Sequence, residues 1–441
     1  MKRILLYGIC TLVSLGLCLA QGYKETLLDS PGLTSGSFLV YDYEHAPDLT
    51  AAPEGYAPFY ISHFARHGAR YCTSEYGRLH DMLSKAYEAD VLSDAGKELL
   101  ERYESFYEKV RYSSGNLTDL GKDQHRNIAR HMFERFPEIF EGHTRIEAVS
   151  TESPRVIMSM WSFLSGVQSL DGDVDIQADA SARFAPWLQP NLSSSPYYIK
   201  EAFEIGKEAK EAKEEYYRSE VPWVEIAGKF FTGADVPEKV LGVTSEKFVT
   251  TLHSVVAGTH CLDHDRGCLD DVFSSDERIL IWKGKSVSFF QDVAYYEGSE
   301  NLRPDYAAFT LEQIIEAADA DIASGCTQLR LRFGHDAALS PLLAFMNVNG
   351  YGRTTASFEE ALDIYPDYSV PMGASVQLVF YRNADGNVLV RVLHNEKDAS
   401  LPFSPVYEVF YRWEDFKNHY AHKISASTAR IEALMCSLKE S

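Results

Sequence analysis

An apolar run from Phe59 to Phe64 leads almost directly into the string Arg66-His67-Gly68-Ala69-Arg70. The run predicts a strand that gives way to a loop where the charged residues begin. Two guanidiniums then surround one imidazole, and the planar fork of an arginine matches the oxygens of a phosphate group. A neutral imidazole can attack phosphorus and carry the phosphoryl group, while Gly68 lets the backbone approach a ligand closely. The string therefore indicates phosphate chemistry at a strand end.

A second charged position follows another predicted strand. The extended run Ile146 to Val149 is followed by a turn, by Arg155 and by apolar residues at helical spacing up to Leu164. Arg155 then lies on the first turn of a helix, where free amides and the macrodipole favour anions. An arginine there would strengthen a phosphate site. The alternative is a solvated charge without that role.

A third cluster, Gly334-His335-Asp336, follows the alternating run Leu329 to Phe333. Ligands of open α/β sheets gather beyond the carboxyl ends of strands, so the three clusters can meet in one crevice. His335 can bind phosphate there. Asp336 can protonate a leaving alkoxide, because a carboxyl group held near a substrate dianion can stay protonated at mildly acidic pH. Asp336 can also serve as the N-cap of a helix over Ala337 to Met346.

These spaced motifs, with the stretch Leu117 to Gln124 that contains Gly121, resemble the histidine phosphatase superfamily. The resemblance is to its acid phosphatase and phytase branch, including multiple inositol polyphosphate phosphatases, and it covers most of the chain after the amino-terminal segment. It implies an α/β fold with a mainly parallel sheet flanked by helices, a phosphoglycerate-mutase-like core, and an inserted, mostly helical cap domain.

The same resemblance implies the roles of six residues. His67 is the nucleophile that becomes phosphohistidine, Asp336 is the proton donor, and the phosphate is clamped by Arg66, Arg70, Arg155 and His335. The expected activity is metal-independent hydrolysis of phosphomonoesters, with no cofactor. A mutase-like phosphotransferase, which shields its intermediate from water, is an alternative, as is a relative that binds phosphate ligands without turnover.

The chain departs from the family pattern at two places, of which the first loosens only a local constraint and the second bears on the substrate. Cys72 stands where many members of the branch have proline, and Ala337-Ala338 stands where phytases often have Thr-Asn. Inositol polyphosphate phosphatases usually carry His-Ala-Glu in place of His-Asp, but the stretch Leu339 to Tyr351 looks closer to that group. Inositol polyphosphates such as phytate are therefore the expected substrates, with sugar or nucleotide phosphates as the alternative.

Cys72 and Arg78 offer a competing chemistry, because they have the Cys-x5-Arg spacing of cysteine phosphatases. Such a loop wraps backbone amides around a phosphate dianion. Here it would contain Glu75, a carboxylate that would repel the dianion. We therefore interpret the spacing as coincidence.

The amino terminus has the pattern of a signal peptide. Lys2 and Arg3 precede an apolar stretch from Ile4 to Leu19, with a plausible cleavage site after Ala20. No later stretch is long enough to span a membrane. The sequence thus predicts a protein exported to the periplasm or the extracellular space, where disulfides can persist.

Five cysteines follow the predicted cleavage site, and Cys261 and Cys268 bracket a short polar loop. They are the expected local disulfide, although spacing does not establish connectivity. The loop residues His260, Asp263, His264 and Asp265 could instead bind a metal with a thiolate. Their spacing matches no standard zinc pattern, so no metal site is predicted.

A net charge of -22 disfavours nucleic acids and anionic membranes as partners. A small phosphomonoester remains the expected partner, and its pocket must concentrate positive charge. The length of 441 residues exceeds one ordinary domain. The predicted division is a signal peptide at 1–20, an α/β catalytic core at 21–168 and 297–441, and a helical cap insertion at 169–296. Within the core, alternating residues on both sides of Asp385-Gly386 predict a hairpin at a sheet edge.

Overall fold

The computed structural model describes residues 22–41 and 43–440, so the predicted signal peptide lies outside the described residues. The strands are β1 (Ala57–Arg66), β2 (Thr144–Ser150), β3 (Val174–Ala180), β4 (Leu329–Gly334), β5 (Ser375–Arg382), β6 (Val388–His394), β7 (Lys397–Ala399) and β8 (Phe410–Arg412). The α-helices are α1 (Tyr23–Asp29), α2 (Glu75–Glu88), α3 (Asp94–Val110), α4 (Asp119–Arg135), α5 (Pro154–Leu170), α6 (Ala185–Leu188), α7 (Lys207–Glu220), α8 (Trp223–Gly228), α9 (Ser245–Thr259), α10 (Ser275–Val293), α11 (Arg303–Ser324), α12 (Asp336–Phe345), α13 (Phe358–Ile364) and α14 (Trp413–Glu440).

The strands form one sheet in the order β3-β2-β4-β1-β5-β6-β7, with β8 also paired to β6. The strands from β3 to β1 run parallel, whereas β5 and the strands after it pair antiparallel. The predicted α/β fold class is confirmed, and so is the hairpin of β5 and β6. The hairpin does not form the sheet edge, however, because β7 and β8 both pair with β6.

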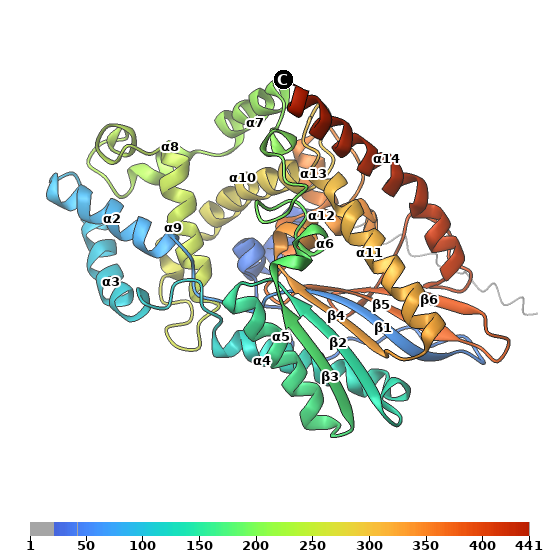
Figure 1. The fold of residues 1–441 in the computed structure, drawn as a ribbon. Helices are drawn as coiled ribbons and strands as arrows, with labels where there is room; N and C mark the ends of the chain where they lie inside the picture. Colours follow the sequence, from blue (N-terminus) through green and yellow to red (C-terminus); the bar gives the residue numbers. More distant parts are fainter. Residues whose placement is uncertain (1–21, 42, 441) are drawn as a thin grey trace, which may run out of the picture.

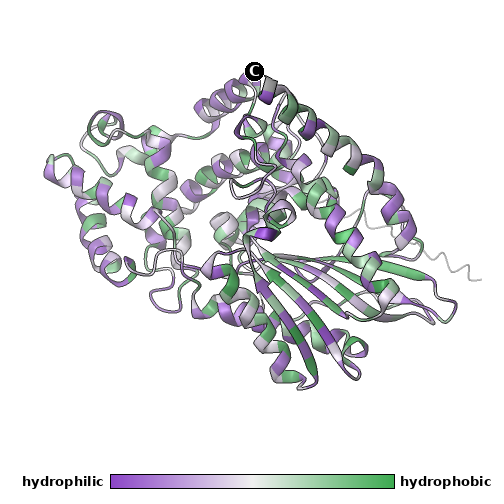
Figure 2. Cartoon of the chain, viewed as in Figure 1, coloured by the Kyte–Doolittle hydropathy of each residue, from purple (hydrophilic) through white to green (hydrophobic). Residues whose placement is uncertain are grey.

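Helices cover both faces of the sheet (Figure 1). On one face, Ile61 and Phe333 pack with apolar residues of α4 and α5 such as Phe163. On the other, Tyr60 and Phe64 belong to the large core that includes α11, α12 and α14. A strand buried on both faces is apolar almost throughout, which explains the run that begins at Phe59. Figure 2 shows the green apolar residues of the central strands and the mixed faces of the outer helices.

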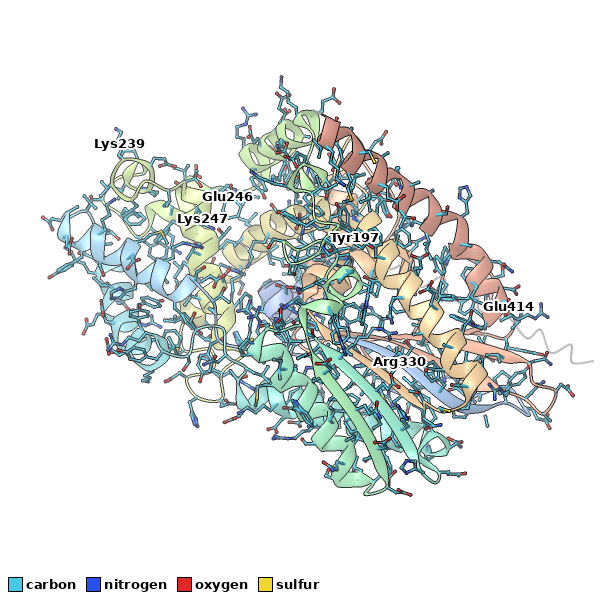
Figure 3. All side chains as sticks on the ribbon, in the orientation of Figure 1. Tyr197, Lys239, Glu246, Lys247, Arg330 and Glu414 are labelled. Carbon is cyan, nitrogen blue, oxygen red and sulfur yellow. The ribbon has the colours of Figure 1, made fainter. Side chains whose placement is uncertain are left out.

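A helical body lies beside the sheet and contains α2, α3, α8 and α9 (Figure 1). Two of these helices, α2 and α3, precede the predicted insertion at 169–296, and β3 lies within that insertion but pairs with β2. The domain division stays a prediction. Charged side chains such as Lys239, Glu246 and Lys247 project from the outer helices (Figure 3). Within the described part of the chain, no helix is both long enough and apolar enough to cross a membrane.

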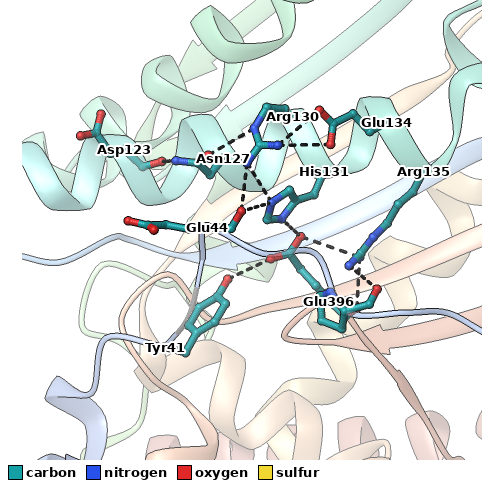
Figure 4. Close-up of polar contacts among 10 residues, drawn as sticks. Tyr41, Glu44, Asp123, Asn127, Arg130, His131, Glu134, Arg135 and Glu396 are labelled. Carbon is teal, nitrogen blue, oxygen red and sulfur yellow. Dashed lines mark hydrogen bonds and ion pairs between the residues drawn. The ribbon is translucent and has the colours of Figure 1, made fainter.

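A buried polar network fixes α4 against the turn between β6 and β7 (Figure 4). Glu396, in that turn, is 1% exposed and accepts a hydrogen bond from Nδ1 of His131 at 2.9 Å. Nη1 of Arg135 donates to the backbone carbonyl of Glu396 at 3.1 Å. Glu396 has a φ of +65°, a left-handed conformation that is costly for a residue with a side chain. The network therefore secures both the turn and the helix that borders the candidate site.

Candidate active site

The three charged clusters meet because their strands are neighbours in the parallel part of the sheet. Arg66, the last residue of β1, lies beside Gly334, the last residue of β4, and Ser150 of β2 lies beside Phe333. The loop backbones then continue the pairing, since the His67 N–H donates to the Gly334 carbonyl at 3.0 Å. The carboxyl ends of three strands thus bring together the predicted residues, as the open-sheet argument requires.

His67 is held as a neutral imidazole. It is 2% exposed, and its Nδ1 lies 2.9 Å from the carbonyl oxygen of Gly68. A carbonyl can only accept, so this contact selects the tautomer with the proton on Nδ1 and leaves the lone pair on Nε2. Burial, together with Arg66, His335 and the other arginines, lowers the pKa of His67 well below its usual range. The ring is therefore prepared for nucleophilic attack through Nε2.

Arg66 is fully buried and held at three points. Its Nη1 donates to the carbonyl oxygens of Ser37 at 2.6 Å and Val370 at 2.7 Å. Its Nη2 lies 2.9 Å from Oδ2 of Asp336. These contacts leave the guanidinium a single orientation, with its charge beside both the nucleophile and the predicted proton donor.

Arg70 and Arg155 complete the cationic cluster. Nη1 of Arg70 donates to the carbonyl of Tyr71 at 2.9 Å, and its guanidinium lies 5.2 Å from the ring centroid of Phe38. Arg155, on the first turn of α5, places Nη2 3.5 Å from Nδ1 of His335. Its pKa is lowered by burial and by the neighbouring Arg70. The three guanidiniums are thus close enough to repel one another electrostatically.

Each of these arginines keeps one buried donor without a protein acceptor. Nε of Arg66, Nε of Arg70 and Nε of Arg155 have no hydrogen-bond partner among the described residues. Buried charged donors are costly unless an acceptor satisfies them. An anion bound among the three guanidiniums would also offset their mutual repulsion. The cluster is therefore suited to an oxyanion such as phosphate.

His335 and Asp336 close the other side of the cluster. Nε2 of His335 lies 3.3 Å from Oγ1 of Thr151, and the ring centroids of His335 and His67 are 5.5 Å apart. Burial and Arg155 lower the pKa of His335 to about 4. Asp336 is half-buried, and although burial raises the pKa of its carboxyl, Arg66, His335, Arg70 and the Ala337 amide together lower it below its ordinary value. Asp336 is not the N-cap of the helix, as the sequence allowed. It is the first residue of α12, and the N-cap is His335.

Two glycines set the shape of the nucleophile loop. A Cβ atom on Gly68 would collide with the carbonyl of Gly121, and one on Gly121 would collide with the carbonyl of Ala69. The sequence assigned Gly68 to close approach of a ligand, but the structure shows close approach of α4 instead. The amides of the loop are also occupied, because Gly68 N–H donates to Ser159 Oγ and Ala69 N–H donates to Gln124 Oε1.

Some of the residues that shape the site were missed in the sequence. Ser159 lies four residues after Arg155, and this helical spacing was a usable signal. Ser37 and Val370 act through backbone carbonyls, so their side chains carry no signal at all.

The structure does not support a cysteine nucleophile. Cys72 is fully buried, burial raises the pKa of its thiol, and Sγ donates to the Ser254 carbonyl at 3.5 Å. Arg78 lies on α2, where it bonds to Ser74 at the surface. No phosphate loop joins the two residues.

The expected disulfide between Cys261 and Cys268 is wrong, since both thiols are free in the structure. Cys261 is fully buried and its Sγ donates to the Phe38 carbonyl at 3.4 Å, whereas Cys268 lies partly exposed in the turn that follows. The Cys261 thiol therefore bonds to a carbonyl oxygen in the core and not to Cys268.

The polar loop beyond Cys261 has structural contacts. Asp263 accepts hydrogen bonds from the amides of Asp119 and Leu120 and so caps α4, and Asp265 pairs with Lys109. In the described ranges, no group of three His, Cys, Asp or Glu side chains is arranged to hold a metal ion.

Comparison with known proteins agrees with this geometry. Residues 63–214 match the family described as histidine phosphatase superfamily (branch 2). The predicted resemblance to this superfamily is confirmed. Among solved structures, the multiple inositol polyphosphate phosphatase of Bifidobacterium longum, in complex with inositol hexasulfate, is 19% identical with a TM-score of 0.72. That alignment covers 87% of this chain and 96% of the other.

Two phytases share the histidine phosphatase fold. The D. castellii phytase is 15% identical over 89% of this chain and 85% of its own, with a TM-score of 0.68. The Hafnia alvei phytase in complex with myo-inositol hexakis sulphate is 11% identical over 85% and 98%, with a TM-score of 0.52. None of the curated proteins matches the chain. The family match and the shared fold support phosphatase activity on small phosphate esters.

Proposed function

We propose that this protein is an exported, metal-independent histidine acid phosphatase that hydrolyses inositol polyphosphates such as phytate. The observation that carries the proposal is a buried, neutral His67 whose electrostatic environment is set by Arg66, His335, Arg70 and Arg155. A phosphate group bound among these side chains presents its phosphorus to Nε2 of His67. Inositol polyphosphates are proposed as substrates because the multiple inositol polyphosphate phosphatase and the phytases share the fold.

The reaction proceeds in two steps. Nε2 of His67 attacks phosphorus, the bond between phosphorus and the ester oxygen breaks, and Asp336 gives its proton to the departing alkoxide. A water molecule then attacks the phosphohistidine, Asp336 takes the proton from that water, and the bond between phosphorus and nitrogen breaks. Inorganic phosphate leaves and His67 returns to its neutral form.

The cationic cluster lowers the barrier in both steps. Arg66, Arg70 and Arg155 stabilise the charge that spreads over the phosphoryl oxygens, and their positions are fixed before the substrate arrives. His335 is neutral, and a ring N–H can donate to the same oxygens. These four side chains supply the positive charge and the hydrogen-bond donors that the phosphoryl group needs, so we propose that the reaction uses no metal.

The first test is phosphate release from phytate at about pH 5 with a metal chelator present, where neutral His67 is expected to persist. The full-length chain after signal removal is compared with His67→Ala and with His143→Ala. His143 is an exposed histidine just before β2, at the end of the strand opposite to the site. We expect release by wild type and His143→Ala and none by His67→Ala.

The other outcomes separate the alternatives. Release from glucose 6-phosphate or AMP but not from phytate would replace the proposed substrate with general phosphomonoesters. Phosphate binding in calorimetry without release from any ester would indicate a non-catalytic relative. Export is tested by fractionation and amino-terminal sequencing, which we expect to begin at Gln21.

A further inference from the structure

The orientation of Arg66 depends on two loops that are far apart in the sequence. The Ser37 carbonyl belongs to the helical turn η1 (Pro31–Phe38), and the Val370 carbonyl follows the turn η8 (Asp367–Ser369). Both carbonyls accept from the same nitrogen, Nη1. If either loop moved, the guanidinium would lose one of its two fixed acceptors. Something must therefore hold η1 against η8.

Asp367 occupies that position. It is 4% exposed, its Oδ1 accepts from Nε1 of Trp282 at 2.8 Å, and its own N–H donates to Oγ of Ser286 at 3.1 Å. The backbone of Ser37 lies near enough to the Asp367 carboxyl to favour its ionised form. A Cβ on Gly36, whose φ is +57°, would collide with that carboxylate. The carboxylate thus links η1, η8 and α10.

Asp367 also lies within electrostatic range of Arg66. It contributes to the electrostatic environment of Arg66, together with Asp336. Burial raises the pKa of Asp367 to about 6, although Lys285 and Trp282 act in the opposite direction. In the acid range Asp367 is therefore largely neutral, and it acts on Arg66 through the contacts that join the two loops.

We propose that Asp367 is a positioning residue that fixes the Arg66 guanidinium for phosphate binding by joining the Ser37 and Val370 loops. The inference rests on the proposed function, because it assigns Arg66 to the phosphate. Asp367 itself touches neither Arg66 Nη1 nor the nucleophile in the contacts described above. Its effect reaches the phosphate only through Arg66.

The test compares Asp367→Asn with Asp321→Asn. Asp321 is a matched control, since it is also buried, at 5% exposure, and pairs with Arg330 on the α11 face of the sheet. For each variant, kcat and KM with p-nitrophenyl phosphate and the Kd of inorganic phosphate from calorimetry are measured, with thermal melting as the check of folding. We expect Asp367→Asn to weaken phosphate binding and raise KM about tenfold, the effect of one lost hydrogen bond of about 1.4 kcal/mol. We expect Asp321→Asn to leave the phosphate Kd unchanged.

A second comparison shows whether the effect passes through Arg66. Lysine at position 66 cannot donate to both carbonyls in the same geometry, so Asp367→Asn should weaken phosphate binding much less in an Arg66→Lys background. Trp282→Phe removes one hydrogen bond to Asp367 and should give a smaller effect of the same sign. It serves as the test variant if Asp367→Asn does not fold.

Two results would overturn the proposal. One is a folded Asp367→Asn with the phosphate Kd and KM of wild type, and the other is an equal loss in the Arg66→Lys background. Wild type that binds phosphate but releases none would reject the proposed hydrolysis only, because the Kd comparison would still decide the role of Asp367. Wild type that does neither would reject both.

Discussion

Nη2 of Arg66 lies 2.9 Å from Oδ2 of Asp336, so the predicted phosphate ligand and the predicted proton donor are an ion pair. Arg66, with His335, Arg70 and the Ala337 amide, keeps the pKa of Asp336 below its ordinary value despite the burial of the carboxyl. A phosphate dianion that binds Arg66 competes for the same positive charge and adds a negative one beside Asp336. Both effects raise the proton affinity of Asp336, so the substrate itself prepares the acid.

Replacing the Asp336 carboxyl should show how much turnover depends on its proton. Asp336→Asn cannot give or take the proton, so we expect kcat with phytate to fall roughly 10²- to 10⁴-fold. With p-nitrophenyl phosphate, whose leaving group needs little protonation, the first step should lose much less. The measurement is kcat on both substrates together with burst kinetics. Equal losses on both substrates in the first step would argue against Asp336 as the acid.

The dependence of activity on pH follows from the same two groups. His67 has a lowered pKa, so it stays neutral and nucleophilic well below its unperturbed value of roughly 6.5. Asp336 is ionised in the protein alone, so its proton must arrive with the substrate. Phosphomonoesters lose their second proton at about pH 6. We therefore expect kcat/KM to be high in the acid range and to fall above about pH 6.

The check is a profile of kcat/KM from about pH 3 to about pH 9 in buffers of constant ionic strength. Asp336→Asn serves as the reference, because it should lose the dependence that arises from this carboxyl. A steady rise towards alkaline pH in wild type would contradict the assignment.

The contact between Gly68 and Gly121 should be intolerant of a methyl group. Gly121→Ala forces the added Cβ against the Ala69 carbonyl, so we expect a loss of about 1–3 kcal/mol in the free energy of unfolding. The shifted loop should also reduce turnover. Gly228→Ala, at a position with nothing within 4 Å of the added Cβ, is the control and should retain both stability and activity. Urea unfolding and phosphate release measure the two effects.

Removal of the Cys72 thiol should leave the chemistry intact. Cys72→Ala leaves a small cavity beside Gly258, so we expect a loss of about 1 kcal/mol in stability and a kcat close to wild type. His67→Ala should show the opposite pattern, with no turnover and an ordinary melting temperature. If a folded Cys72→Ala protein had no turnover, Cys72 rather than His67 would be the better candidate for the nucleophile.

The sequence predicted the strand ends well because each one joins an apolar run to a charged cluster. The hairpin of β5 and β6 was also readable, from its alternation around Asp385-Gly386. Its place within the sheet was not, because β7 and β8 are only three residues long and give almost no periodic signal.

Other features depend on contacts that no local pattern encodes. Gly68 looked like a ligand-binding glycine because sequence cannot show that α4 passes against it. Cys261 and Cys268 are close in the chain, but packing at the Phe38 carbonyl directs the first thiol elsewhere. The carbonyls that hold Arg66 could come from any residue type, so the least predictable part of the site is its backbone.

The pairing of β1 has a consequence for biosynthesis. Its two neighbours in the sheet are β4 and β5, which follow it by more than two hundred residues, and Arg66 takes one acceptor from Val370, 304 residues further on. During translation, β1 therefore emerges long before either neighbour, with its apolar residues and both edges unpaired. Such a nascent chain is prone to aggregate, so we expect its yield of native protein to depend on chaperones that protect it until β5 has been made.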